Sequence, residues 1–222
     1  MAVVSPSAPP GGPAPRPKLR GALHLAALPV SLVAGLVLVV AVADGPGERW
    51  GCAVYALASA VLFGVSALYH RGTWDPRTRA RLRRLDHADI FLMIAGTYTP
   101  ICLALLSGTE QRVVLGIVWA GAAAGIVFRV VWLSAPAWVY TPFYVALGWV
   151  AVTVLPSLAE AGGGAVVALI VAGGVAYSLG GVVYALRRPD PVPDVYGYHE
   201  VFHTCTLVGF ATHYIAVALA VS

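Results

Sequence analysis

The chain has 222 residues, of which 59% are hydrophobic and only 11% are charged, with a formal net charge of +4. Soluble globular domains carry about 25% charged residues, so this composition excludes an ordinary soluble domain and indicates a membrane protein. Almost every residue beyond about residue 20 belongs to an apolar segment or a short connection. Any chemistry must therefore lie inside the membrane bundle or at its rims.

Residues 1–20 are rich in Pro, Ala, Ser and Gly. Such a stretch buries too little apolar surface to order itself, and we expect a disordered cytoplasmic tail. The apolar run that follows, roughly 22–43, is longer than the ~7–15-residue apolar region of a signal peptide and should be the first membrane span. We therefore divide the chain into a tail, 1–20, and one membrane domain, 21–222.

Seven windows reach the length of about 20 apolar residues that a helix needs to cross a membrane. They are 22–43, 51–70, 87–106, 113–133, 138–158, 165–186 and 199–220. Short breaks rich in Gly, Pro or charged residues separate most of them, including AEAGGG at 159–164. The sequence thus predicts an all-α, polytopic bundle of seven transmembrane helices.

Basic residues are distributed unevenly between the two sides of this bundle. Of the 14 Lys and Arg residues, 12 fall on one side, mainly in the tail and in the connection 71–85, whereas Arg49 and Arg112 fall on the other. The positive-inside rule then predicts a cytoplasmic amino terminus and an external carboxyl terminus in the cell membrane. Because the asymmetry accounts for the positive charge, no nucleic-acid partner is expected.

Four titratable residues share one depth near the inner face of the predicted bundle: His70, Asp86, His199 and His203. Such side chains are costly close to hydrocarbon, so their grouping indicates a functional site. His199 and His203 are four residues apart and lie on one helix face, a spacing at which two histidines bind one zinc ion. His70 would be a third ligand, and three protein ligands with one open position are typical of catalytic zinc.

Two further residues complete this predicted site. Asp86 would orient water or a ligand histidine, and Ser66, one turn before His70, would line the pocket. Simpler interpretations stay open: the histidine pair could bond only to neighbouring helices, and Asp86 could be the N-cap of the third span, with Asp89 in its first turn.

The other titratable and thiol residues are expected to have ordinary structural roles. His24 and His87 lie near the same face without a helical partner. His213 is about 15 Å beyond His203 along the helix, too far to share a metal, and should bond to another helix. The cysteines lack zinc-type spacing, although a bridge between Cys52 and Cys102 stays open because both are expected near the outer face.

Three motifs together closely resemble the hemolysin III family, the bacterial branch of the progestin and adipoQ receptor family that includes the adiponectin receptors. They are Ser66-x3-His70, the segment RLDHADIFLMIAGTYTP at 84–100, and His199-x3-His203 followed by His213. The resemblance extends from about residue 20 to the end of the chain.

This resemblance implies a seven-helix bundle in which His70, His199 and His203 hold zinc. The family's aspartate and serine match Asp86 and Ser66, whereas Asp89 stands where a small or neutral residue is usual. Eukaryotic members are tied to ceramidase-like hydrolysis, and bacterial members carry a name derived from hemolysis.

Three functions are compatible with these features. The first is an intramembrane zinc hydrolase with membrane lipids as partners and a lipid amide or ester as substrate, for which zinc would activate water. The second is a non-catalytic sensor or regulator of membrane state with structural zinc. The third, cytolysis, follows from the family name alone. A retinal protein is excluded because the only lysine, Lys18, lies in the tail.

Overall fold

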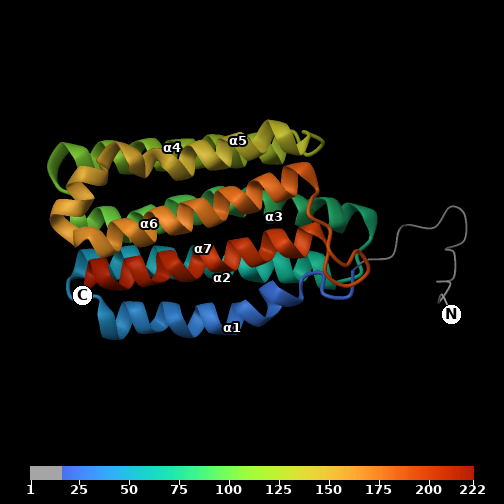
Figure 1. Ribbon diagram of the computed structural model, residues 1–222, viewed down its shortest axis with the longest axis horizontal. Coiled ribbons are helices and arrows are strands. Elements are labelled where there is room, and N and C mark those ends of the chain that lie inside the picture. Colours follow the sequence, from blue (N-terminus) through green and yellow to red (C-terminus); the bar gives the residue numbers. More distant parts are fainter. Residues whose placement is uncertain (1–16) are drawn as a thin grey trace, which may run out of the picture.

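The computed structural model describes residues 17–222 as a bundle of helices joined by short turns (Figure 1). No strand forms in this part of the chain, which confirms the predicted all-α class. The elements are α1 (Ala22–Val37), the π-helical turn η1 (Leu38–Val42), α2 (Pro46–Arg71), α3 (Pro76–Leu105), α4 (Gly108–Val131), α5 (Ala137–Gly148), the 3-10 segment η2 (Trp149–Val154), α6 (Leu155–Leu186) and α7 (Tyr198–Val221).

Six helical stretches within residues 17–222 are long and apolar enough to cross a membrane. Five correspond to α1 with η1, α2, α3, α4 and α7, and the sixth is the 50-residue stretch Ala137–Leu186, which contains α5, η2 and α6. Gly163 interrupts this stretch with φ 78° and ψ 170°, a left-handed conformation that favours glycine. The chain turns back in this region in Figure 1. The connection predicted at 159–164 is therefore a sharp turn at one glycine within α6.

The third helix begins at Pro76, well before the predicted span start near residue 87. The Asp75 carboxylate caps it by accepting hydrogen bonds from the backbone N–H groups of Arg77 and Thr78, at 2.9 and 3.1 Å. Hydrogen bonding, above all from the Thr78 side chain, lowers the pKa of Asp75. Asp86 is therefore an interior residue of α3, and the interpretation of Asp86 as an N-cap is wrong.

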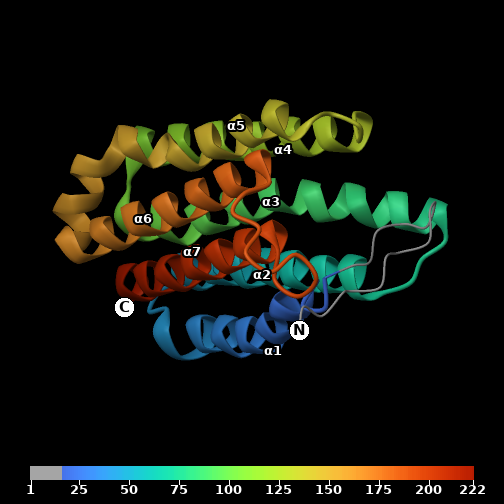
Figure 2. The same cartoon turned by 45° about the vertical axis from the view of Figure 1, so that its right-hand side comes forward.

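The four helices α2, α3, α6 and α7 form the centre of the bundle, with α1 on one side and the α4–α5 pair on the other (Figures 1 and 2). Small residues allow α2 and α3 to approach closely: a Cβ atom added at Gly96 would lie 2.6 Å from the Ala58 Cβ. Such contacts are typical of membrane helices, because no hydrophobic force drives their association in lipid.

The outer surface of the bundle is apolar. On α1, Val30, Val33 and Leu36 are 66%, 64% and 63% exposed, and on α4 Val131 is 78% exposed. Such a surface suits hydrocarbon, where the backbone hydrogen bonds must be satisfied within the helices.

The two ends of the bundle are distinct. At one end the turn Pro17–Arg20 meets the loop before α7, with a hydrogen bond from the Lys18 N–H to the Asp194 carbonyl (3.0 Å). At the other end the Asp44 N–H donates to the Val221 carbonyl (3.3 Å). The start of α1 and the end of α7 thus lie at opposite ends (Figure 1). Residues 1–16 of the predicted tail lie outside the described part of the chain.

Candidate metal centre

Three histidines from two helices converge at the end of the bundle where α1 begins. His70 lies in the last turn of α2, and His199 and His203 lie in the first two turns of α7. One ligand atom from each lies within 4.8 Å of the other two. The side chain of His70 is 8% exposed, and His199 and His203 are 8% and 2% exposed. The structure thus brings together all three predicted ligands, and the cluster can hold a metal ion.

The distance between two of the three histidines fits a tetrahedral ion. The Nε2 atoms of His70 and His199 are 3.2 Å apart. Two imidazole nitrogens at 2.0–2.1 Å from one tetrahedral zinc ion would be about 3.3 Å apart, which agrees with this separation. Two ring nitrogens so close need either a shared proton or a shared cation. The ligand atom of His203 lies within 4.8 Å of the other two.

The fourth predicted residue, Asp86, lies beside this cluster on α3. Its Oδ2 atom is 3.7 Å from the His70 Nε2 atom, the nitrogen that faces His199. The carboxylate is therefore on the side of the imidazole where an ion would bind, not behind the ring. The Ser66 hydroxyl, one turn before His70, hydrogen-bonds to Asp86. Both residues line the same cavity as His199 and His203.

His213, Asp89 and the cysteines do not belong to the three-histidine cluster. The His213 ring bonds to the Ile170 carbonyl on α6 (3.0 Å), as expected for a bond to another helix. Asp89 is buried one turn after Asp86 and is not among the cavity-lining residues. Cys52 and Cys102 are free thiols.

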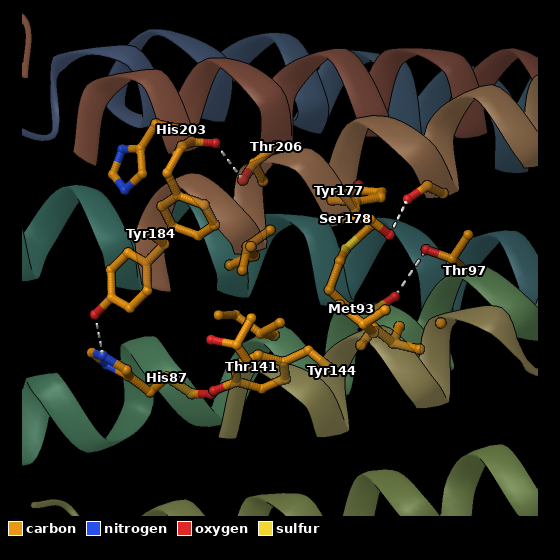
Figure 3. A pocket seen from close by; sticks show the side chains of 18 of the residues that line it. His87, Met93, Thr97, Thr141, Tyr144, Tyr177, Ser178, Tyr184, His203 and Thr206 are labelled. Atoms are coloured by element: carbon orange, nitrogen blue, oxygen red, sulfur yellow. Dashed lines mark hydrogen bonds between the residues drawn. The ribbon is translucent and has the colours of Figure 1, made fainter. Parts of the chain in front are cut away.

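An elongated cavity extends from His199 and His203 into the apolar interior of the bundle (Figure 3). His203, His87 and Tyr184 lie at one end of the view, and Thr97, Ser178 and Tyr177 lie at the other. Both His203 and His213 line the cavity, so it extends about 15 Å along α7. Between these ends the wall contains apolar side chains such as Leu62, Ile90, Met93, Ile94 and Val145. The cavity therefore suits an amphiphile whose polar group lies at the histidine end.

A chain of hydrogen bonds forms the wall beside Asp86. The His87 Nδ1 atom is 2.8 Å from the Arg83 carbonyl, which can only accept, so Nδ1 carries the hydrogen. Nε2 of the neutral ring then accepts from the Tyr184 hydroxyl (3.2 Å), and Tyr184 in turn accepts from the Tyr140 hydroxyl (3.3 Å). The sequence did not indicate this chain, because its members come from α3, α5 and α6.

His24 was also missed, because its contacts are all with other helices. It lines the cavity and stacks on His203, with the ring centroids 3.8 Å apart and the planes 4° apart. The sequence predicted only its depth, near the end of the bundle where His70 lies.

Comparisons with known proteins agree with this arrangement. The model of the family described as haemolysin-III related matches residues 14–214. The chain is 30% identical over 188 residues to the hemolysin-3 homolog of Bacillus subtilis (strain 168), covering 83% of this chain and 85% of that protein. It is 30% identical over 164 residues to hemolysin-3 of Bacillus cereus, covering 74% and 72%.

A plant protein is also similar. The heptahelical transmembrane protein ADIPOR2 of Oryza sativa subsp. japonica is 29% identical over 189 residues, covering 76% of this chain and 81% of that protein. Together with the apolar helices and the three-histidine cluster, the match over most of the chain shows that this integral membrane protein belongs to the haemolysin-III-related family.

Proposed function

We propose that the protein is an intramembrane zinc-dependent hydrolase that cleaves a lipid amide or ester. The observation that carries this proposal is the position of the three-histidine cluster at the polar end of a long apolar cavity. A purely structural metal site needs no such cavity, whereas a hydrolase for lipids needs space for an acyl chain next to the reacting group.

The choice of zinc rests on the donor set. Three neutral imidazole nitrogens with an open fourth position match the ligands of catalytic zinc sites. Bound zinc supplies activated water at neutral pH and polarises a carbonyl group.

The protein's own side chains would bind and orient the reacting groups. The Asp86 carboxylate, 3.7 Å from the His70 Nε2 atom, is placed to accept a hydrogen bond from the attacking water and to take its proton. The hydrogen bond from Ser66 holds that carboxylate in place. The apolar wall would hold the acyl chain and keep bulk water away from the scissile bond.

The alternative is a metal that only joins helices. The Nε2 contact between His70 and His199 links the end of α2 to the start of α7, and an ion there would stabilise this junction. Such a protein could sense or regulate membrane state without turnover. The two functions differ in what Asp86 does, and the third prediction below separates them.

We further propose that the chain crosses the cell membrane seven times, with its amino terminus in the cytoplasm. The turn at Gly163 divides the stretch Ala137–Leu186 into two crossings, and the start of α1 and the end of α7 lie at opposite ends of the bundle. The name of the rice relative, which describes seven helices, supports the same count. The basic loop 71–85 favours the cytoplasm for the histidine end.

The first prediction concerns topology. Single cysteines introduced at Arg77 and at Ser222, in a background without the three native cysteines, should label from opposite sides of the membrane. Residue 77 should react only after the cells are opened, and residue 222 should react in intact cells. Labelling of both from the same side would contradict an odd number of crossings.

The second prediction concerns the metal. Purified protein should contain one zinc ion per chain, and His70→Ala, His199→Ala or His203→Ala should each lower that content strongly, because a three-ligand site loses most of its affinity with one ligand. His213→Ala is the control and should leave the zinc content unchanged. Elemental analysis of each variant provides the measurement, and stoichiometric zinc in the triple alanine variant would refute the site.

The third prediction distinguishes a hydrolase from a protein whose metal only joins helices. Asp86→Asn should retain the metal but abolish metal-dependent release of fatty acid from a panel of lipid amides and esters, because the amide cannot take a proton. The helix should be unaffected, since Asp75 provides its cap. Glu110→Gln removes a carboxylate from the first turn of α4, at the other end of the bundle, and should leave both zinc and activity intact.

Two outcomes would contradict the hydrolase. Unchanged hydrolysis by Asp86→Asn would exclude the proposed role of this carboxylate. The wild-type protein could also release no fatty acid from any lipid of the panel and yet lose thermal stability on chelation. That result would favour a metal that only joins helices.

A further inference from the structure

The first turn of α1 contacts the three-histidine cluster at several points. Gly21, with φ 74°, packs on His70 so closely that an added Cβ would lie 2.6 Å from the His70 Cβ. The Arg20 guanidinium forms an ion pair with Glu200, the residue next to His199. One turn further along α1, His24 stacks on His203. The first helix thus meets the cluster although the sequence pattern assigns it no ligand.

His24 holds a defined position against His203. The planes of the two rings are 4° apart and their centroids are 3.8 Å apart. The Phe63 ring makes an edge contact with His24, with the centroids 5.2 Å apart and the planes at 72°. His24 is only 3% exposed. An imidazole donates its lone pair to a metal in the plane of the ring, so whatever fixes the plane of His203 also fixes the direction of that lone pair.

The same geometry argues against His24 as a fourth ligand. Because its ring plane is parallel to that of His203 and displaced from it, its lone pairs run alongside the His203 lone pair instead of converging with it. His24 also lies outside the group of ligand atoms that are within 4.8 Å of one another.

Stacking, and not hydrogen bonding, holds the His24 ring in place. Among the described residues, neither His24 ring nitrogen has a hydrogen-bond partner. An unpaired buried polar group costs about 1–3 kcal/mol, and a phenylalanine at this position would avoid that cost. The contact that a substitution must preserve is therefore the stacking of a flat ring on His203.

We propose that His24 is a positioning residue of the metal centre, whose flat ring fixes the plane of His203 and so sets the affinity of the site for its metal. The proposal rests on the metal centre proposed above. It makes the first turn of α1 part of the site, with Gly21 held against His70 and Arg20 held next to His199.

The test compares two substitutions that fill the same space. His24→Leu keeps apolar volume but has no flat face, whereas His24→Phe keeps a flat ring and has no nitrogen. The affinities of the full-length purified variants for zinc are measured by competition with a chelator. The visible spectrum of bound cobalt(II) reports the ligand geometry, and thermal unfolding of the metal-free proteins reports the fold.

We expect His24→Leu to weaken metal binding about 10-fold or more and to alter the cobalt spectrum. In other metalloproteins, the loss of a residue that orients a metal ligand has an effect of this size. His24→Phe should restore the affinity and the spectrum of the wild type. Both metal-free variants should unfold at temperatures close to that of the wild type, because neither leaves a cavity nor buries a new polar group. His213→Leu, at a half-buried histidine further along α7, should leave metal affinity unchanged.

Three different results would contradict the role proposed for His24. If His24→Leu binds metal as tightly as the wild type while His203→Ala loses it, His24 does not position His203, although the centre itself stands. If His24→Phe is as weak as His24→Leu, the role belongs to a ring nitrogen and the stacking proposal is overturned. If His203→Ala also keeps the metal, the proposed metal centre is wrong and this inference is overturned with it.

Discussion

The cost of placing titratable side chains in an apolar bundle governs this structure. A charged or polar group near hydrocarbon must find a partner, or it lowers stability by several kcal/mol. His70, His199 and His203 meet this constraint by converging from α2 and α7, with Asp86 from α3 beside them. The contacts that satisfy these groups also hold the three helices together at that end, so fold and site depend on the same interactions.

The rest of the bundle is arranged around this junction. Close contacts between small residues, such as Gly96 and Ala58, bring α2 and α3 together and align Asp86 with His70. The opposite wall of the cavity comes from α5 and α6, where the 3-10 segment Trp149–Val154 departs from the regular α-helix. The Trp149 side chain, from this segment, donates a hydrogen bond to Ser178 (2.9 Å) and lines the cavity.

The sequence was sufficient to predict the all-α class of the fold and the grouping of His70, His199 and His203. Helical spacing puts His199 and His203 on one face, and the charge asymmetry puts them at the depth of His70 and Asp86. The start of α3 was missed because a search for apolar windows overlooks an arginine-rich turn of helix, although the Asp75–Pro76 pair is a recognisable helix start. A single glycine with positive φ at 163 could not be located within a run of three glycines.

His24, Tyr184 and Tyr140 could not be assigned to the site for a different reason. Each acts through contacts across helices: the stacking of His24 on His203 and the hydrogen bonds from Tyr140 through Tyr184 to His87. Such pairs depend on how helices pack and rotate, whereas periodicity reports only neighbours on one helix. The tertiary structure alone brings them to the cavity.

X-ray absorption at the zinc edge of the purified protein would test the central claim most directly. We expect three nitrogen scatterers of imidazole type and one further oxygen scatterer, at about 2.0–2.2 Å. A sulfur scatterer at about 2.3 Å would assign the metal to a cysteine and contradict the three-histidine centre. Fewer than three imidazoles, or no bound zinc at all, would contradict it equally.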